Sequence, residues 1–127
     1  MNDFYYRKLD AYKLAKLLTL QVYTLLRGYP EYEKYGLCDQ LRRAAISIPS
    51  NIAEGTGRVA MKERLHFFDI AYDSLSETLC QFELSKDLNY ISEQQFEDIE
   101  TLASRVSMTL LGLKKSIQEK LNNQQQS

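Results

Sequence analysis

The sequence contains one pair of residues with metal-ligand spacing, Glu63 and His66 of the run Glu63-Arg64-Leu65-His66. On a helix this pair places a carboxylate and an imidazole one turn apart, which is half of a ferritin-like di-iron site. Such a site needs a second motif of the same kind, and the chain has one histidine in total. Carboxylates such as Asp69 or Asp73 do not replace the missing imidazole. We therefore expect no metal and no other cofactor, and interpret His66 as a surface histidine.

Other catalytic arrangements are also incomplete. A serine nucleophile needs a neighbouring base, and His66 is the one residue of the usual type. Glu54, Glu63 and Glu77 could approach one another and carry out acid–base chemistry. We favour the interpretation that these carboxylates form ion pairs with arginines or cap helix ends, because nothing in the sequence indicates a pocket around the carboxylates. We expect a protein that is not an enzyme and has no small-molecule substrate.

The run SIPSNIAEGTGR, residues 47–58, places a proline within a helical pattern. It lacks the spacing of a phosphate-binding loop, and no predicted strand precedes it. The apolar stripe keeps its phase on both sides of Pro49, which predicts one kinked helix in which the carbonyl of Ala45 loses its partner. A helix that begins at Pro49 is the competing interpretation. The freed carbonyl could be reached by Ser47, Ser50 or Asn51.

The same run ends in two glycines, Gly55 and Gly57. We expect them to end the helix in the left-handed conformation that glycine tolerates. Asn51 and Glu54 are neighbours one turn apart beside the kink. They are predicted to hold the backbone there or to contact another subunit, with binding of an outside partner as the alternative. Pro49, Asn51, Glu54, Gly55 and Glu77 are thus assigned structural or interface roles.

Four amphipathic segments position these residues: 7–28, 36–56, 60–87 and 93–121. Their apolar residues recur at steps of three and four, which predicts helices that bury one stripe each. Ser92, with Gln95 three residues later, is a predicted helix cap. Short links between the segments predict an all-α, antiparallel up-down-up-down four-helix bundle over residues 1–121. The polar residues 122–127 are expected to form a disordered tail.

Composition fits one globular domain, since the 127 residues are 44% apolar and 26% charged. The formal net charge of −1 argues against a generic nucleic-acid binder but leaves room for a local basic patch. Residues 1–28 are mostly basic, whereas residues 59–90 are mostly acidic. Cys38 and Cys80 are expected to be buried free thiols of a reducing compartment. The N-terminus has no secretory pattern and no run is long enough to span a membrane, so a cytoplasmic protein is expected.

Basic residues are interleaved with aromatic ones near the N-terminus, where Arg7, Lys8 and Lys13 lie beside Phe4, Tyr5, Tyr6 and Tyr12. Such a segment can stack on bases while it neutralises phosphates. It is also typical of an interface between subunits, which is the favoured interpretation because the overall charge does not favour nucleic acid.

A long part of the chain resembles the 23S rRNA intervening-sequence protein family. The resemblance rests on the run YGLCDQLRRAAISIPSNIAEGTGR, followed by KERLHFFDIAYDSLSETL, and extends over about residues 4–120. Tyr12 stands where this family commonly has a tryptophan. The resemblance implies an antiparallel four-helix bundle that assembles into a ring-like homopentamer and has no catalytic activity. A similar bundle is an accessory subunit of retroelement reverse transcriptases, where it binds nucleic acid and the polymerase.

The resemblance and the basic first segment together predict a homo-oligomeric scaffold that binds RNA, RNA/DNA or a nucleoprotein partner. The alternative is a purely protein-binding accessory module, for example a reverse-transcriptase partner, without nucleic-acid contact. The candidate contacts to phosphate are cations in two groups: Arg7, Lys8, Lys13 and Lys16, and then Arg42, Arg43, Arg58, Lys62 and Arg64.

Overall fold

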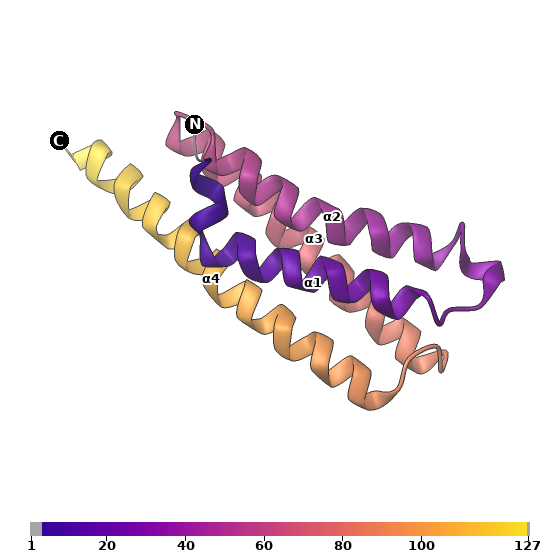
Figure 1. The fold of residues 1–127 in the computed structure, drawn as a ribbon. Helices are drawn as coiled ribbons and strands as arrows, with labels where there is room; N and C mark the ends of the chain where they lie inside the picture. Colours follow the sequence, from indigo (N-terminus) through magenta and orange to yellow (C-terminus); the bar gives the residue numbers. More distant parts are fainter. Residues whose placement is uncertain (1–3, 127) are drawn as a thin grey trace.

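The computed structural model describes residues 4–126. It contains four long helices, α1 (Asp10–Leu26), α2 (Leu37–Thr56), α3 (Met61–Asp87) and α4 (Glu93–Gln126), and two short 3-10 helices, η1 (Tyr5–Lys8) and η2 (Glu31–Glu33) (Figure 1). No strand occurs in this range of the chain. The predicted all-α class is therefore confirmed, and the predicted segments match the observed helices to within a few residues.

Contacts between the helices are consistent with a bundle. Helix α2 contacts α1 and α3, and α4 contacts α3 and α1. In Figure 1, η1, the end of α4 and the link between α2 and α3 lie at one end of the molecule, which we call the η1 end. The α1–α2 and α3–α4 links lie at the opposite end, which we call the η2 end.

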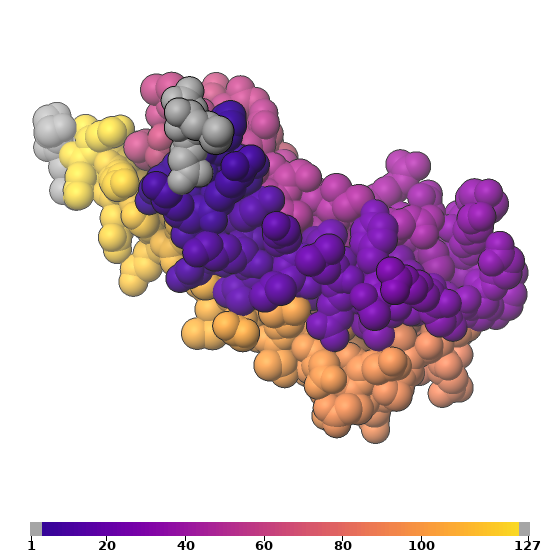
Figure 2. All heavy atoms as spheres, in the orientation of Figure 1, coloured from indigo at the N-terminus to yellow at the C-terminus, as the bar shows by residue number. Residues whose placement is uncertain are grey.

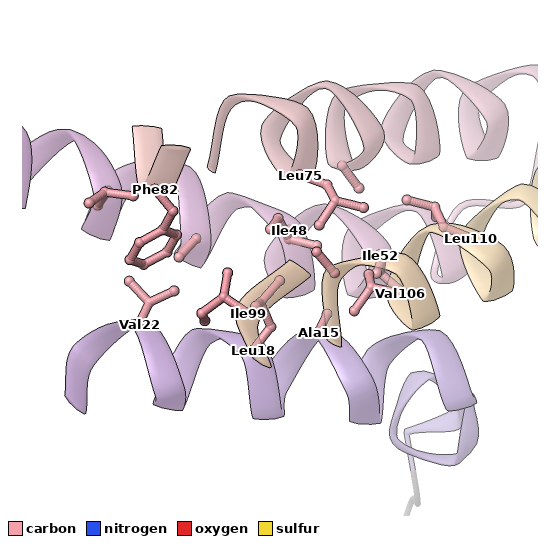
Figure 3. Close-up of a cluster of buried hydrophobic side chains, with 14 of the residues drawn as sticks. Ala15, Leu18, Val22, Ile48, Ile52, Leu75, Phe82, Ile99, Val106 and Leu110 are labelled. Carbon is pink, nitrogen blue, oxygen red and sulfur yellow. The ribbon is translucent and has the colours of Figure 1, made fainter. Parts of the chain in front are cut away.

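The core is formed by the predicted apolar stripes. Figure 3 shows side chains from all four helices meeting in the interior, among them Leu18, Ile48, Leu75 and Val106. Helix α3 differs from the prediction, because polar residues are buried beside its apolar core residues, among them Phe68, Leu75 and Phe82. Two of their hydroxyls donate to carbonyls of the same helix, Thr78 to Ser74 (2.8 Å) and Ser85 to Gln81 (2.8 Å). The buried polar residues of α3 are Ser74, Thr78, Gln81 and Ser85.

Helix α4 begins at the predicted cap and extends beyond the predicted end. The Gln95 amide donates to Ser92 Oγ (3.0 Å), and the Ser92 amide donates to Gln95 Oε1 (2.8 Å), which together form a capping box. The helix then runs through Gln126, so the expectation of a disordered tail is corrected for residues 122–126. Leu121 still packs against the core, and after two asparagines the chain continues with glutamines, which are good helix formers. Residue 127 lies outside the described residues. Over the described part of the chain, no helix is both long and apolar enough to cross a membrane.

Candidate nucleic-acid interface

Helix α2 passes through Pro49 without interruption, so a separate helix beginning at Pro49 is ruled out. Proline has no N–H to donate to the carbonyl of Ala45, four residues earlier. Thr19 Oγ1 of helix α1 lies 3.1 Å from this carbonyl oxygen and 2.9 Å from that of Ala15, and its single proton serves both. The partner of the freed carbonyl therefore comes from the neighbouring helix and not from the serines or the asparagine near Pro49.

Asn51 lies in the contact between α2 and α3. Its Nδ2 donates to the carbonyl oxygen (2.7 Å) and the Oγ (2.9 Å) of Ser47. Ser74 Oγ of α3 donates to the same Ser47 Oγ (2.8 Å). Asn51 is thus part of a polar chain that joins the two helices.

Gly55 lies inside α2 and is buried against α3, which corrects the predicted helix-ending role. No glycine of residues 4–126 has a positive φ, and the residue that ends α2, Gly57, has φ −81°. A Cβ atom at Gly55 would lie 2.9 Å from Phe68 Cε1 and 3.0 Å from Phe67 Cβ. Gly55 is therefore required by close packing between helices and not by backbone conformation.

Five of the nine predicted cations lie at the η1 end. Arg7 and Lys8 belong to η1, Arg58 follows α2, and Lys62 and Arg64 belong to the first turn of α3. Figure 2 shows the start of the chain, the region between α2 and α3 and the end of α4 gathered at this end of the molecule.

Lysines of α4 join this group, and the sequence reasoning missed them. Lys120 lines a pocket of about 230 Å³ together with Arg64 and Tyr5. The sequence of α4 could have indicated their role, because its charged residues are mostly acidic near the start of the helix and mostly basic toward the end. We use the name basic end for the cations at the η1 end of the bundle; they are Arg7, Lys8, Arg58, Lys62, Arg64, Lys115 and Lys120.

Two arginines of the basic end are held in place by the fold. Arg58 forms an ion pair with Glu54, and its guanidinium carbon lies 4.8 Å from the centre of the Phe67 ring. Arg64 Nε donates to the carbonyl of Arg58 (2.6 Å). Because Glu54 pairs with an arginine, the structure favours the ion-pair interpretation of this carboxylate over acid–base chemistry.

The other four predicted cations lie elsewhere. Lys13 and Lys16 are exposed on α1, and Lys13 lines a groove against Arg105 of α4. Arg42 and Arg43 lie in the first half of α2, where Asp39 is 3.7 Å and 3.1 Å from their side chains. The nine cations therefore do not form a single surface.

The remaining polar candidates show no catalytic arrangement. His66 is exposed, with its ring 5.4 Å from that of Phe67, and Glu77 accepts a hydrogen bond from Gln81 Nε2 (3.0 Å). Across residues 4–126, no three or more histidine, cysteine or acidic side chains are placed to hold a metal ion.

Only one of the two thiols is buried. Cys38 is buried, which raises its pKa, but Cys80 is exposed on α3, so the expectation of two buried cysteines is wrong for Cys80. Both neighbours of Cys80 along the chain, Leu79 and Gln81, are directed toward the interior, which leaves this position on the outer side of the helix.

Comparison with known families matches residues 7–112 to the profile described as 23S rRNA-intervening sequence protein. The chain belongs to this family. A crystal structure from Bacteroides thetaiotaomicron VPI-5482, described as a protein with unknown function from the S23 ribosomal protein family, is similar with a TM-score of 0.74. The two chains are 21% identical over 83% of this chain and 98% of the other, so the likeness shows the fold of this intervening-sequence protein and no more. A search among proteins with curated descriptions finds no match.

Proposed function

We propose that this 23S rRNA-intervening sequence protein is a non-enzymatic, homo-oligomeric scaffold that binds RNA through its basic end. The observation that carries the proposal is the meeting of cations from η1, the end of α2, the start of α3 and the end of α4 at one end of the bundle. Clustered lysines and arginines neutralise phosphates and release counterions, which supplies most of the non-specific affinity for nucleic acid.

Charge separation along the bundle reconciles this proposal with a net charge of −1. The η2 end carries carboxylates from η2 and from the start of α4. A molecule of this kind attracts a polyanion at one end and repels it at the other, whatever its net charge. The acidic residues of the η2 end include Glu31, Glu33, Glu93, Glu97 and Asp98.

The test is filter binding of structured ribosomal RNA and of an RNA/DNA hybrid at low and moderate salt. One triple variant, Lys62→Gln, Lys115→Gln and Lys120→Gln, removes three of the seven positive charges of the basic end. Each lost phosphate contact lowers the slope of log affinity against log salt by about 0.7–0.9, so we expect a slope smaller by about 2–3.

A matched control removes three positive charges near the η2 end, through Lys34→Gln, Arg42→Gln and Arg43→Gln. This control should retain the original slope and most of the affinity. Equal losses in the two variants would contradict the assignment of the basic end. Absence of binding at low salt would overturn RNA binding altogether.

A purely protein-binding role is the second candidate, and exposed apolar side chains on α1 and α2 favour it. Leu20 and Ile46 have 57% and 43% of their surface exposed, and Tyr23 of α1 is also exposed. A partner such as a reverse transcriptase would bury these residues and contact Arg42. Under this alternative, Arg42→Glu abolishes capture of a purified partner and leaves nucleic-acid affinity unchanged.

For the scaffold itself we propose an antiparallel up-down-up-down bundle, with α2 bent at Pro49, that assembles into a ring-like homopentamer. Short links between consecutive helices, the pairwise helix contacts and the position of η1 and of the end of α4 at the same end of the molecule in Figure 1 support the alternating direction. The missing backbone bond at Pro49 supports the bend. Light scattering that gives a single-chain molar mass would contradict the assembly.

A further inference from the structure

Helix η1 and the second half of α2 line an open pocket of about 460 Å³ outside the bundle core, and Arg58 is the residue of the basic end that lines it. Phe4, Tyr5 and Tyr6 of the η1 segment form one wall. The other wall comes from the run SIPSNIAEGTGR, and its polar members are Ser50, Glu54 and Arg58. This is the outward side of the run whose inward side packs against α1 and α3.

The aromatic wall presents unburied ring surface that is held in position. Phe4 and Tyr5 have 60% and 64% of their surface exposed. The Tyr6 ring is fixed from behind by an edge-to-face contact with Tyr12, with 4.7 Å between ring centres. Aromatic rings that remain exposed next to cations are the stacking platforms that single-stranded nucleic acids use.

Gly57 lines the same pocket, and the chain's own fold does not require a glycine there. Its φ of −81° suits any residue. A Cβ at this position would make only ordinary contacts, at 3.7 Å from the Glu54 carbonyl oxygen and 3.8 Å from that of Ala53. Because Gly57 has no side chain, it leaves space in the pocket that a larger residue would fill. At Gly55, by contrast, close packing against α3 requires glycine.

We propose that this pocket binds an unpaired nucleobase. The base stacks on the exposed rings of Phe4 and Tyr5, while the Ser50 hydroxyl, the Glu54 carboxylate and the Arg58 guanidinium offer acceptors and donors to its edge. Cations of the basic end flank the pocket and neutralise the phosphates on either side of the base. The inference deepens the proposed function and rests on it, because it names a single-stranded segment as the part of the nucleic acid that is recognised.

The first experiment compares two single-stranded RNA oligomers of equal length, one with all its bases and one with abasic sites throughout. Both carry the same number of phosphates, so simple charge neutralisation predicts equal affinity. We expect the full-length protein to bind the oligomer with bases at least tenfold more tightly in fluorescence anisotropy, because stacking of one base contributes a factor of this size. Equal affinities would overturn the inference. The matching DNA oligomers and a nucleoside monophosphate as competitor show whether RNA, DNA or a free nucleotide supplies the base.

Two variants place the effect in the pocket. Tyr5→Ala removes a stacking surface, and Gly57→Leu fills the pocket from the opposite wall. Each should lose about tenfold in affinity for the oligomer with bases, with no change for the abasic oligomer. The salt slope should also be unchanged, since neither substitution alters a charge. Tyr35→Ala is the matched control, because Tyr35 is 85% exposed and follows η2 at the far end of the molecule.

The outcomes separate the inference from the proposed function. Tyr5→Phe keeps the ring and should bind the oligomer with bases as tightly as the original protein does. This result, set beside the loss in Tyr5→Ala, distinguishes stacking from a general disturbance of η1. If binding depends on salt but is equal for the two oligomers and unchanged in both pocket variants, the nucleobase pocket is refuted. The assignment of the basic end is then still supported. Absence of binding to either oligomer at low salt refutes both.

Discussion

At Gly55 the backbone of α2 comes so close to α3 that a methyl group has no room. Substitution Gly55→Ala would place Cβ 2.9 Å from Phe68 Cε1, 3.0 Å from Phe67 Cβ and 3.1 Å from the Arg64 carbonyl oxygen. Relief of this overlap requires the helices to separate, because two of the three atoms are too close to the backbone to turn away. We expect the free energy of unfolding to fall by about 1–3 kcal/mol, measured by urea denaturation.

A matched glycine in α4 should respond in the opposite direction. Gly112 is exposed, and a Cβ atom added there would meet nothing within 4 Å beyond the backbone of its own helix. Gly112→Ala should therefore raise the free energy of unfolding by up to about 1 kcal/mol, since alanine is the better helix former. A stabilising Gly55→Ala would show that α2 and α3 are not packed as described.

The hydroxyl of Tyr29 is buried without a hydrogen-bond partner among the described residues. The Oγ of the nearby Ser85 donates to the Gln81 carbonyl (2.8 Å). Burial raises the pKa of Tyr29 to about 12, from about 10 in an unfolded chain. Between these values the unfolded chain releases the proton first, so this residue's contribution to stability is present below pH 10 and declines as the pH rises toward 12.

Tyr29→Phe removes both the unpartnered hydroxyl and its titration. At pH 7 we expect the variant to be as stable as the original protein or more stable by up to about 1 kcal/mol. Above about pH 10 the difference in the midpoint of thermal unfolding should widen in favour of the variant. A loss of stability at pH 7, or a constant difference up to about pH 11.5, would contradict this account of the hydroxyl.

At the scale of helices, Pro49 makes α2 depend on α1. The Ala45 carbonyl has lost its backbone donor to the proline and accepts instead from Thr19 Oγ1 (3.1 Å). Thr19→Val keeps the shape of the side chain but leaves this carbonyl without that donor. We expect a loss of about 1–2 kcal/mol in the free energy of unfolding. Thr24→Val is the control, because the exposed Thr24 hydroxyl bonds only to the Leu20 carbonyl of its own helix (3.2 Å).

A double-mutant cycle isolates this dependence. Pro49→Ala returns an N–H to the backbone, so the Ala45 carbonyl regains a partner within α2. On that background Thr19→Val should change stability by less than about 0.5 kcal/mol, which gives a coupling of about 1 kcal/mol between the two positions. Additive effects would mean that Thr19 does not substitute for the missing backbone donor.

The helices were predictable from the sequence because each signal is local. Apolar spacing located the four stripes, and Ser92 with Gln95 located the start of α4. The roles of Gly55 and Thr19 were not predictable, since both depend on which residues of another helix lie opposite. The same limit applies to the basic end, where Lys120 meets Arg64 and Tyr5 only after the chain has folded.

At the scale of the whole molecule, the backbones of α1 and α3 do not come into contact and lie on opposite sides of the bundle. Their outer sides combine exposed apolar residues with opposite charges. Helix α1 presents Leu20 and Lys16, and Arg27 caps its end, whereas α3 presents Leu84 with acidic residues, Asp73 and Glu77. Complementary patches on opposite faces produce head-to-tail contacts, which close into a ring when the rotation between copies permits.

We propose that copies of the chain contact one another through these two faces, and such a contact predicts the result of charge reversal. The double variant Lys16→Glu/Arg27→Glu should lower the molar mass measured by light scattering, because its α1 would repel the acidic side of α3 on the next copy. Addition of Asp73→Lys and Glu77→Lys to this double variant reverses the charge of both faces. The larger assembly should then return, since an acidic α1 face attracts a basic α3 face. Reversal of Lys115 and Lys120 to Glu on α4 is the control and should leave the mass unchanged. An assembly that tolerates the α1 variant at about 0.1 M salt, or that the fourfold variant fails to recover, would exclude this pair of faces as the contact between copies.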